Sequence, residues 1–176
     1  MRIIKTILKI IVALVVILLV AALFMSKDYR VEKSITINKP KTEVFNYIRS
    51  LKNQDNFSKW ASMDPSMKKS SRGTDETVGF TTMWEGNSDV GKGEQEIKKI
   101  EEGKRIDFEL RFEKPMKDVS QAYMSTDSIA PTQTLVKWGF TGNMSYPMNI
   151  MGLVMDKMVG GDFETGLANL KALMEK

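Results

Sequence analysis

The most constraining feature of this 176-residue sequence is an uninterrupted apolar run near its N-terminus. From Ile10 to Met25 there is no charged or polar side chain, and a helix over these 16 residues would be about 24 Å long. If Lys9 extends its ammonium group towards lipid headgroups, the run approaches the roughly 30 Å thickness of a bilayer's hydrocarbon core. A helix that is apolar on every side does not suit the surface of a folded core. The run therefore predicts a transmembrane helix within residues 7–25.

A cleaved signal peptide is the alternative interpretation, because a basic leading stretch precedes the apolar segment in both kinds of sequence. The run is slightly longer than the roughly 7–15 residues of a signal-peptide core. A cleavage site is also poor, since Val20-Ala21-Ala22 is the best candidate and large side chains follow it. We therefore predict an uncleaved single-pass anchor in residues 1–26 and one further domain in residues 27–176.

The distribution of charge bears on orientation and on partners. Arg2, Lys5 and Lys9 precede the run, which favours a cytoplasmic N-terminus and an extracytoplasmic domain, although Lys27 and later basic residues reduce the bias. Without this flank, 23 basic and 22 acidic residues remain, so the pI near 9.2 reflects the N-terminus. Charges in the rest of the chain mostly alternate in sign, as on a solvated surface, so we expect no nucleic-acid partner.

The chain has no cysteine and no histidine. This composition excludes disulfides, thiolate zinc sites and cysteine nucleophiles, together with Ser–His dyads and histidine-ligated metals. Gly91-Lys92-Gly93 has the start of a phosphate-binding loop, but Glu96 stands where a third glycine is required and the flanking segments are strands. We therefore expect neither a metal ion nor a cofactor.

Alternation of apolar and polar residues predicts an antiparallel sheet in residues 27–176. In the clearest segment, Ile106, Phe108, Leu110 and Phe112 alternate with charged residues, so one face of the sheet is covered and the other is solvated. The expected strands cover residues 31–37, 78–84, 91–98, 106–113, 119–126 and 132–141.

Helical segments are expected on both sides of this strand series. Asn38-Lys39-Pro40 supplies a capping side chain and a first-turn proline for the first of two short helices after the opening strand. The C-terminal segment has apolar residues at helical spacing from Met148 to Val159 and again beyond Asp162. We expect Gly160-Gly161 to interrupt it and Asp162 to cap the last helix. This layout is α+β, with the C-terminal segment covering the sheet.

Several local strings occur in the same order as these elements, spread over roughly residues 30–174. They include Val31–Ile37 leading into Pro40, Gly91–Ile97, Lys104-Arg105-Ile106 and Gly161–Leu167. In these features the chain resembles the polyketide-cyclase-like branch of the SRPBCC superfamily, also called START-like or helix-grip domains. The resemblance implies a curved antiparallel sheet wrapped around a long C-terminal helix, with a hydrophobic cavity between them. It also implies binding of lipids, sterols or polyketides, and it brings no universal catalytic residue.

Candidate cavity residues come from the covered sheet face and from the C-terminal helix. Among them Gln95 is the inward polar residue that could orient a ligand, and Tyr123 is a weaker candidate for that role. Methionines near the C-terminal helix could form an adaptable lid, because thioethers repack readily. For any single aromatic side chain of this set, core packing is the favoured role. The set is Phe80, Trp84, Gln95, Phe108, Leu110, Phe112, Tyr123, Trp138, Phe140, Met151, Met155, Phe163 and Leu167.

Three functions fit this sequence. The first is membrane-tethered binding of a hydrophobic small molecule or lipid, which predicts a closed apolar cavity. The second is a cyclase- or hydrolase-like enzyme acting on a bulky apolar substrate, which predicts converging titratable groups. The third is a protein-interaction module, which predicts a filled core and an exposed apolar patch. We favour the first, because the commonest catalytic side chains are absent.

Overall fold

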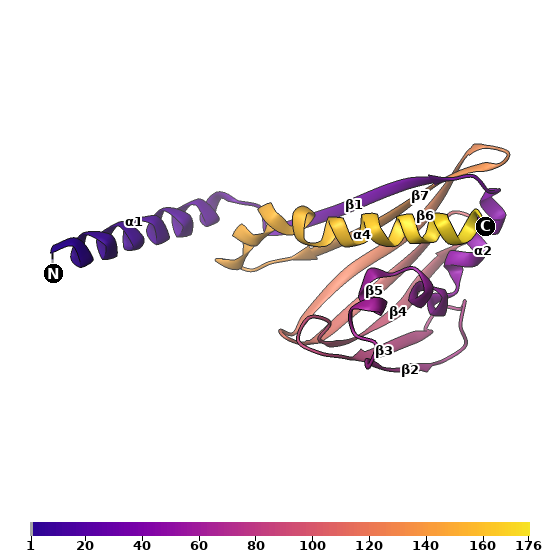
Figure 1. The fold of residues 1–176 in the computed structure, drawn as a ribbon, viewed down its shortest axis with the longest axis horizontal. Helices are drawn as coiled ribbons and strands as arrows, with labels where there is room; N and C mark the ends of the chain where they lie inside the picture. Colours follow the sequence, from indigo (N-terminus) through magenta and orange to yellow (C-terminus); the bar gives the residue numbers. More distant parts are fainter. Residues whose placement is uncertain (1) are drawn as a thin grey trace.

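The computed structural model describes residues 2–176 and begins with a helix that projects from the rest of the chain (Figure 1). This helix is α1 (Arg2–Phe24). Its 22 residues Ile3–Phe24 are long and apolar enough to span a membrane, a property that signal sequences share. Nearly all described side chains of α1 are exposed, but Ala22 is buried where α1 meets the domain.

A seven-stranded antiparallel sheet forms most of the domain, with the strand order β1-β7-β6-β5-β4-β3-β2. Strands β2 to β7 are neighbours in chain order, whereas β1 pairs with β7, so that β1 and β2 form opposite edges of the sheet. The sheet is curved, so it has a concave and a convex face (Figure 1). The strands are β1 (Asp28–Ile37), β2 (Lys68–Arg72), β3 (Thr81–Glu85), β4 (Lys92–Glu101), β5 (Arg105–Lys114), β6 (Asp118–Ala130) and β7 (Gln133–Asn143).

Three short helical segments connect β1 to β2. They are α2 (Lys41–Arg49), the 3₁₀ helix η1 (Leu51–Asn56) and α3 (Lys59–Met63). Apolar side chains at helical spacing place Val44, Phe45 and Ile48 on the buried side of α2, which lies against β6 and β7. The expected short helices after the first strand are therefore present, with a 3₁₀ turn between them.

The C-terminal helix α4 (Gly152–Met174) follows a short 3₁₀ helix, η2 (Met148–Met151). It runs along the concave side of the sheet, mainly against β1 (Figure 1). Its buried side includes Phe163, Leu167 and Leu170. The predicted α+β helix-grip architecture is therefore confirmed.

The prediction that Gly160-Gly161 divides the C-terminal segment is wrong, because α4 continues through both residues. A glycine inside a helix costs about 1 kcal/mol relative to alanine. The buried side chains of Met155 and Phe163 on the adjacent turns hold both halves in place. Asp162 consequently lies inside the helix, where its carboxylate pairs with the ammonium group of Lys59 on α3 instead of capping a helix.

The sheet also differs from expectation at its β2 edge. The strand expected at residues 78–84 begins only at Thr81, and Val78 is exposed. Residues 68–72 form an additional edge strand that no apolar pattern indicated, because all five of its side chains are polar and exposed. Only pairing with β3 defines this strand, and its lysines suit an open sheet edge.

Candidate ligand-binding site

Aromatic side chains fill the interior beneath the middle of α4. Trp138 on β7 stacks on Phe163 of α4, with ring centroids 4.8 Å apart and an interplanar angle of 14°. Phe57 and Trp60 approach the Trp138 ring edge-on, at centroid distances of 5.6 and 6.3 Å. This aromatic cluster occupies space in which the sequence predicted part of a cavity, so it acts first as packed core.

Gly166 on α4 allows the indole ring to come this close to the helix. A Cβ atom at this position would lie 2.8 Å from Cζ3 of Trp138 and 3.5 Å from the carbonyl oxygen of Phe57. The next residue, Leu167, is 1% exposed. The helix is therefore seated closely on the sheet at this level.

The structure divides the thirteen predicted cavity residues into three groups. Seven belong to the buried core, five are half-buried, and Tyr123 lies elsewhere. The buried group is Phe80, Phe108, Trp138, Phe140, Met155, Phe163 and Leu167. The half-buried group is Trp84, Gln95, Leu110, Phe112 and Met151.

The concave face is less completely covered over β3, β4 and β5 than over β1. Trp84 on β3 and Phe112 on β5 meet edge-to-face with ring centroids 5.9 Å apart, and both remain half-buried. Leu110 lies on the same face of β5 and is also half-buried. Because α4 lies mainly against β1, at the opposite edge of the sheet, these side chains form a partly open apolar surface. We call Trp84, Leu110 and Phe112 the open surface.

Gln95 on β4 is the polar residue of this region. In the strand register it lies between Thr82 of β3 and Leu110 of β5. Within residues 2–176, its side chain takes part in no hydrogen bond or ion pair. Its amide can therefore both donate and accept a hydrogen bond from a molecule packed on the open surface.

Tyr123 lies on the outer face of the sheet and does not line the interior. Residues on β6 alternate between the faces, and its neighbours Ala122 and Met124 belong to the core. The Tyr123 hydroxyl donates to the carboxylate of Glu32, and the guanidinium of Arg105 lies 3.7 Å from the centre of its ring. Its low exposure comes from these polar neighbours, which the sequence pattern did not indicate.

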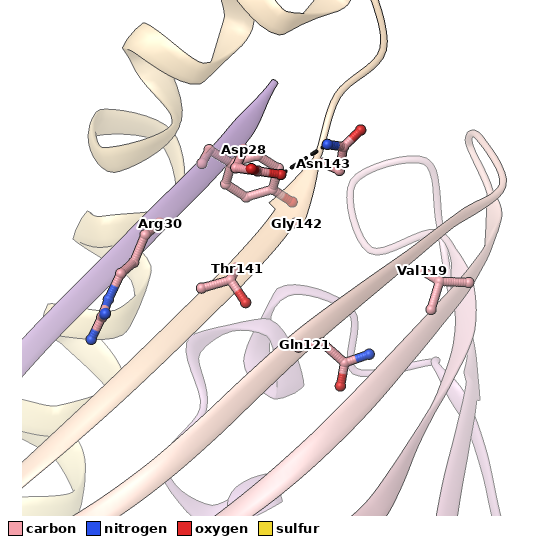
Figure 2. A pocket seen from close by; sticks show the side chains of 8 residues that line it. Asp28, Arg30, Val119, Gln121, Thr141, Gly142 and Asn143 are labelled. Atoms are coloured by element: carbon pink, nitrogen blue, oxygen red, sulfur yellow. Dashed lines mark hydrogen bonds between the residues drawn. The ribbon is translucent and has the colours of Figure 1, made fainter. Parts of the chain in front are cut away.

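A hollow of about 510 Å³ opens on the outer face where β6 and β7 separate (Figure 2). Their pairing begins at Gln121 and Thr141, so the strand ends beyond this pair diverge. On the concave side Tyr29 reaches across, with its hydroxyl 3.3 Å from Oγ of Ser120, and burial raises the pKa of Tyr29. The lining residues are Asp28, Tyr29, Arg30, Val119, Gln121, Thr141, Gly142 and Asn143.

The sequence did not single out these lining residues. The residue types on β6 and β7 contain no signal that their pairing stops at Gln121 and Thr141. Glycine at position 142 is the one local feature that accompanies the gap, since a Cβ there would lie 2.3 Å from the Tyr29 hydroxyl oxygen. The divergence therefore depends on how Tyr29 packs between distant strands.

A second hollow, of about 390 Å³, borders the open surface beside β2, β3 and β4. The indole of Trp84 forms part of its wall, together with Lys69 of β2 and Lys92 of β4. Lys92 also pairs with Glu113, at 3.2 Å. Of the predicted cavity residues, Trp84 is the one that lines either of the two hollows described here.

The charged groups facing the concave side of the described chain are paired for structural purposes. Lys33 of β1 bridges Asp156 and Glu164 of α4, with both N–O distances at 3.1 Å. The hydrogen bond to Glu164 contributes most to raising the pKa of Lys33, and the hydrogen bond to Asp156 contributes next. The cation therefore holds α4 on the sheet, and its charge is already balanced.

Comparison with known proteins agrees with this architecture. Residues 28–175 match the family described as polyketide cyclase / dehydrase and lipid transport, and no curated protein matches the sequence. Similar solved structures include a protein from Nitrosospira multiformis (TM-score 0.58, 17% identity, 82% of this chain and 95% of that chain). A second is a protein from Chromobacterium violaceum (TM-score 0.59, 12% identity, 84% of this chain and 97% of that chain). A third is the Aha1 dimer from Colwellia psychrerythraea (TM-score 0.55, 15% identity, 83% of this chain and 96% of that chain). These structural likenesses establish the fold alone, whereas the family match covers almost the whole domain, and the chain therefore belongs to the polyketide cyclase / dehydrase and lipid transport family.

Proposed function

We propose that this protein is a single-pass membrane protein whose domain binds a hydrophobic small molecule or a lipid on the concave side of its sheet. The observation that carries the proposal is the open surface of Trp84, Leu110 and Phe112, with Gln95 beside it. An apolar surface with few polar groups is typical of small-molecule sites. The family's association with lipid transport supports the same class of ligand.

The structure of α1 supports the membrane tether. The segment Ile3–Phe24 is about 33 Å long at the usual rise per residue, and the basic residues Arg2, Lys5 and Lys9 lie at the N-terminal end of α1. Ala22, near the end of α1, is buried against η2. This contact gives α1 a place in the folded protein, which favours an uncleaved anchor over a signal peptide. On the basic flank we place the domain on the extracytoplasmic side.

Binding is favoured over catalysis by the chemistry of the concave side. A chain of polar groups on this side runs from Tyr29 through Ser120 to Asp118, with Ser120 Oγ donating to Asp118 at 2.8 Å. Burial raises the pKa of Tyr29, so its phenol stays protonated at neutral pH and is a poor base. Gln95, beside the open surface, can orient a ligand but does not titrate.

Native mass spectrometry of the full chain, released from detergent micelles with its co-extracted lipids, tests the proposal. We expect one equivalent of an apolar ligand to remain bound. Leu110→Trp fills the open surface and should reduce ligand retention by at least tenfold. Ile129→Trp is the matched control. Ile129 is an exposed apolar residue near the C-terminal end of β6, whereas Leu110 pairs with Ser120 near the N-terminal end of that strand.

Equal ligand retention by the two variants would place any bound lipid outside the open surface and refute the proposal. Absence of any bound apolar molecule would favour the second candidate, a protein-interaction module. The specific observation behind that candidate is the filled interior around Trp138 and Phe163. It predicts a protein partner cross-linked to the domain in place of a retained ligand.

A further inference from the structure

The end of α1 is fastened to the domain by a buried asparagine side chain. Asn149 in η2 is 2% exposed, and its Nδ2 donates to the carbonyl oxygens of Ala22 at 2.7 Å and Met25 at 3.1 Å. The last carbonyl groups of a helix have no partner within the helix itself. Asn149 therefore supplies, from a distant part of the chain, the hydrogen bonds that complete the C-terminus of α1.

The connection between α1 and β1 is also short and structured. Only residues 25–27 separate the two elements, and the backbone N–H of Met144 donates to the carbonyl of Lys27 at 2.8 Å. The four residue steps from Phe24, at the end of α1, to Asp28, at the start of β1, span at most about 14 Å. If α1 crosses a bilayer, the start of β1 must lie close to the headgroup layer.

Exposed apolar side chains gather at this same end of the domain. In α4 all three large apolar residues that are exposed, Leu153, Val154 and Met158, belong to its first two turns. Tyr146 and Met148, just before α4, are exposed as well. The first turns of α4 and η2 lie where α1 leaves the domain (Figure 1). We call these five residues the junction surface.

Lysines without an ion pair lie at the same end of the domain as the junction surface. Lys27 follows α1, Lys157 lies on α4, and Lys114 and Lys117 flank the β5–β6 turn, at the sheet end where β1 starts and β7 ends. Across the described residues 2–176, none of these four lysines takes part in an ion pair. Exposed apolar side chains with lysines at the same end are typical of surfaces that lie in the headgroup region of a bilayer.

We propose that the junction surface lies in the headgroup layer of the same membrane that α1 crosses, with its apolar side chains in the acyl boundary and the lysines at this end of the domain on anionic lipid phosphates. The proposal rests on the proposed membrane span and is independent of the ligand on the concave face. The contact fixes the orientation of the domain, so that α4 begins at the membrane and its C-terminus points away from it.

Single-cysteine labelling of the full chain in vesicles tests this contact, because the chain has no cysteine of its own. A bimane label is attached at Met148→Cys or Leu153→Cys, and at Ile129→Cys as the control. Ile129 and Met148 are matched in exposure, at 54% and 50%. In vesicles of phosphatidylcholine and phosphatidylglycerol, lipids carrying a doxyl group near the headgroup should quench the labels at positions 148 and 153 but not at 129.

Two results with the labelled cysteines would overturn the proposal. One is equal quenching at positions 153 and 129, and the other is a blue-shifted but unquenched label at position 153, which would identify a protein partner or a second copy instead of lipid. The lysines are tested by Lys157→Glu, with Lys176→Glu, two residues beyond the C-terminal end of α4, as control. A lysine near an anionic surface changes the ratio of bound to free states about fivefold, so only Lys157→Glu should weaken quenching, and equal quenching in both variants would refute the headgroup contact.

Discussion

Two glycines in α4 should respond differently to the same substitution. In a helix interior, alanine is favoured over glycine by about 0.8–1 kcal/mol. Gly161 has no neighbouring atom within 4 Å of the place a Cβ would occupy. Gly161→Ala should therefore stabilise the protein by nearly the full difference in helix propensity.

At Gly166 the same gain is offset by steric overlap. The new Cβ would lie 2.8 Å from Cζ3 of Trp138, whereas ordinary contact begins at 3.4 Å. The indole cannot move aside freely, because Phe163 stacks on its face and Phe57 packs against it. Overpacking of this kind costs about 1–3 kcal/mol, so the net effect of Gly166→Ala should range from neutral to a loss of about 2 kcal/mol.

Thermal unfolding of the full chain in one detergent, followed by far-UV circular dichroism, measures the difference. For a protein of this size 1 kcal/mol corresponds to a change in Tm of about 2–4 °C. We expect Gly161→Ala to unfold above the wild type and Gly166→Ala at or below it. A Tm for Gly166→Ala equal to or above that of Gly161→Ala would show that the indole does not press on α4 as described.

Three further changes test other parts of the structure. Leu167→Ala should lose about 2–5 kcal/mol as a buried large-to-small substitution, and a loss below about 0.5 kcal/mol in urea titration would contradict its place on the buried side of α4. The hydrogen bond from Arg111 lowers the pKa of Glu96, so its contribution to stability exists above the ordinary pKa of 4.5 and disappears as the pH falls through the folded value; Glu96→Gln should flatten this acid-side loss of Tm. Asn149→Leu removes both hydrogen bonds to α1, and it should broaden the distance distribution between spin labels on α1 and β7, whereas an unchanged distribution would show that Asn149 does not hold the helix.

Period-two alternation was sufficient to predict most of the sheet because one face of the strands meets a core and the other meets water. Residues such as Phe108 and Val136 face the core where the pattern places them, and both are fully buried. The edge strand β2 has no such asymmetry, because water reaches both of its faces. An alternation pattern cannot exist there, and only the hydrogen bonds to β3 define the strand.

The division of the concave face into filled and open parts could not be read from the sequence. Phe108 and Phe112 occupy equivalent places in the same alternating segment, yet Phe108 is fully buried and Phe112 is half-buried. The difference depends on where the covering helices lie over the curved sheet. That placement is a tertiary property, set by distant contacts such as those of Trp138 with Phe163.

Lys33 shows how a residue that breaks a pattern can still be informative. It interrupts the apolar face of β1, and a cation on a covered face requires opposite charge across the interface. Asp156 and Glu164 supply that charge from α4, one turn before and one turn after Gly160. A Cβ at Gly160 would lie 2.5 Å from Cε of Lys33, so the glycine leaves room for the lysine chain to pass between the two carboxylates. Gly160, which resembled a helix break, therefore makes room for the Lys33 side chain. The unexpected lysine and the unexpected glycine are both explained by the ion pairs that join β1 to α4.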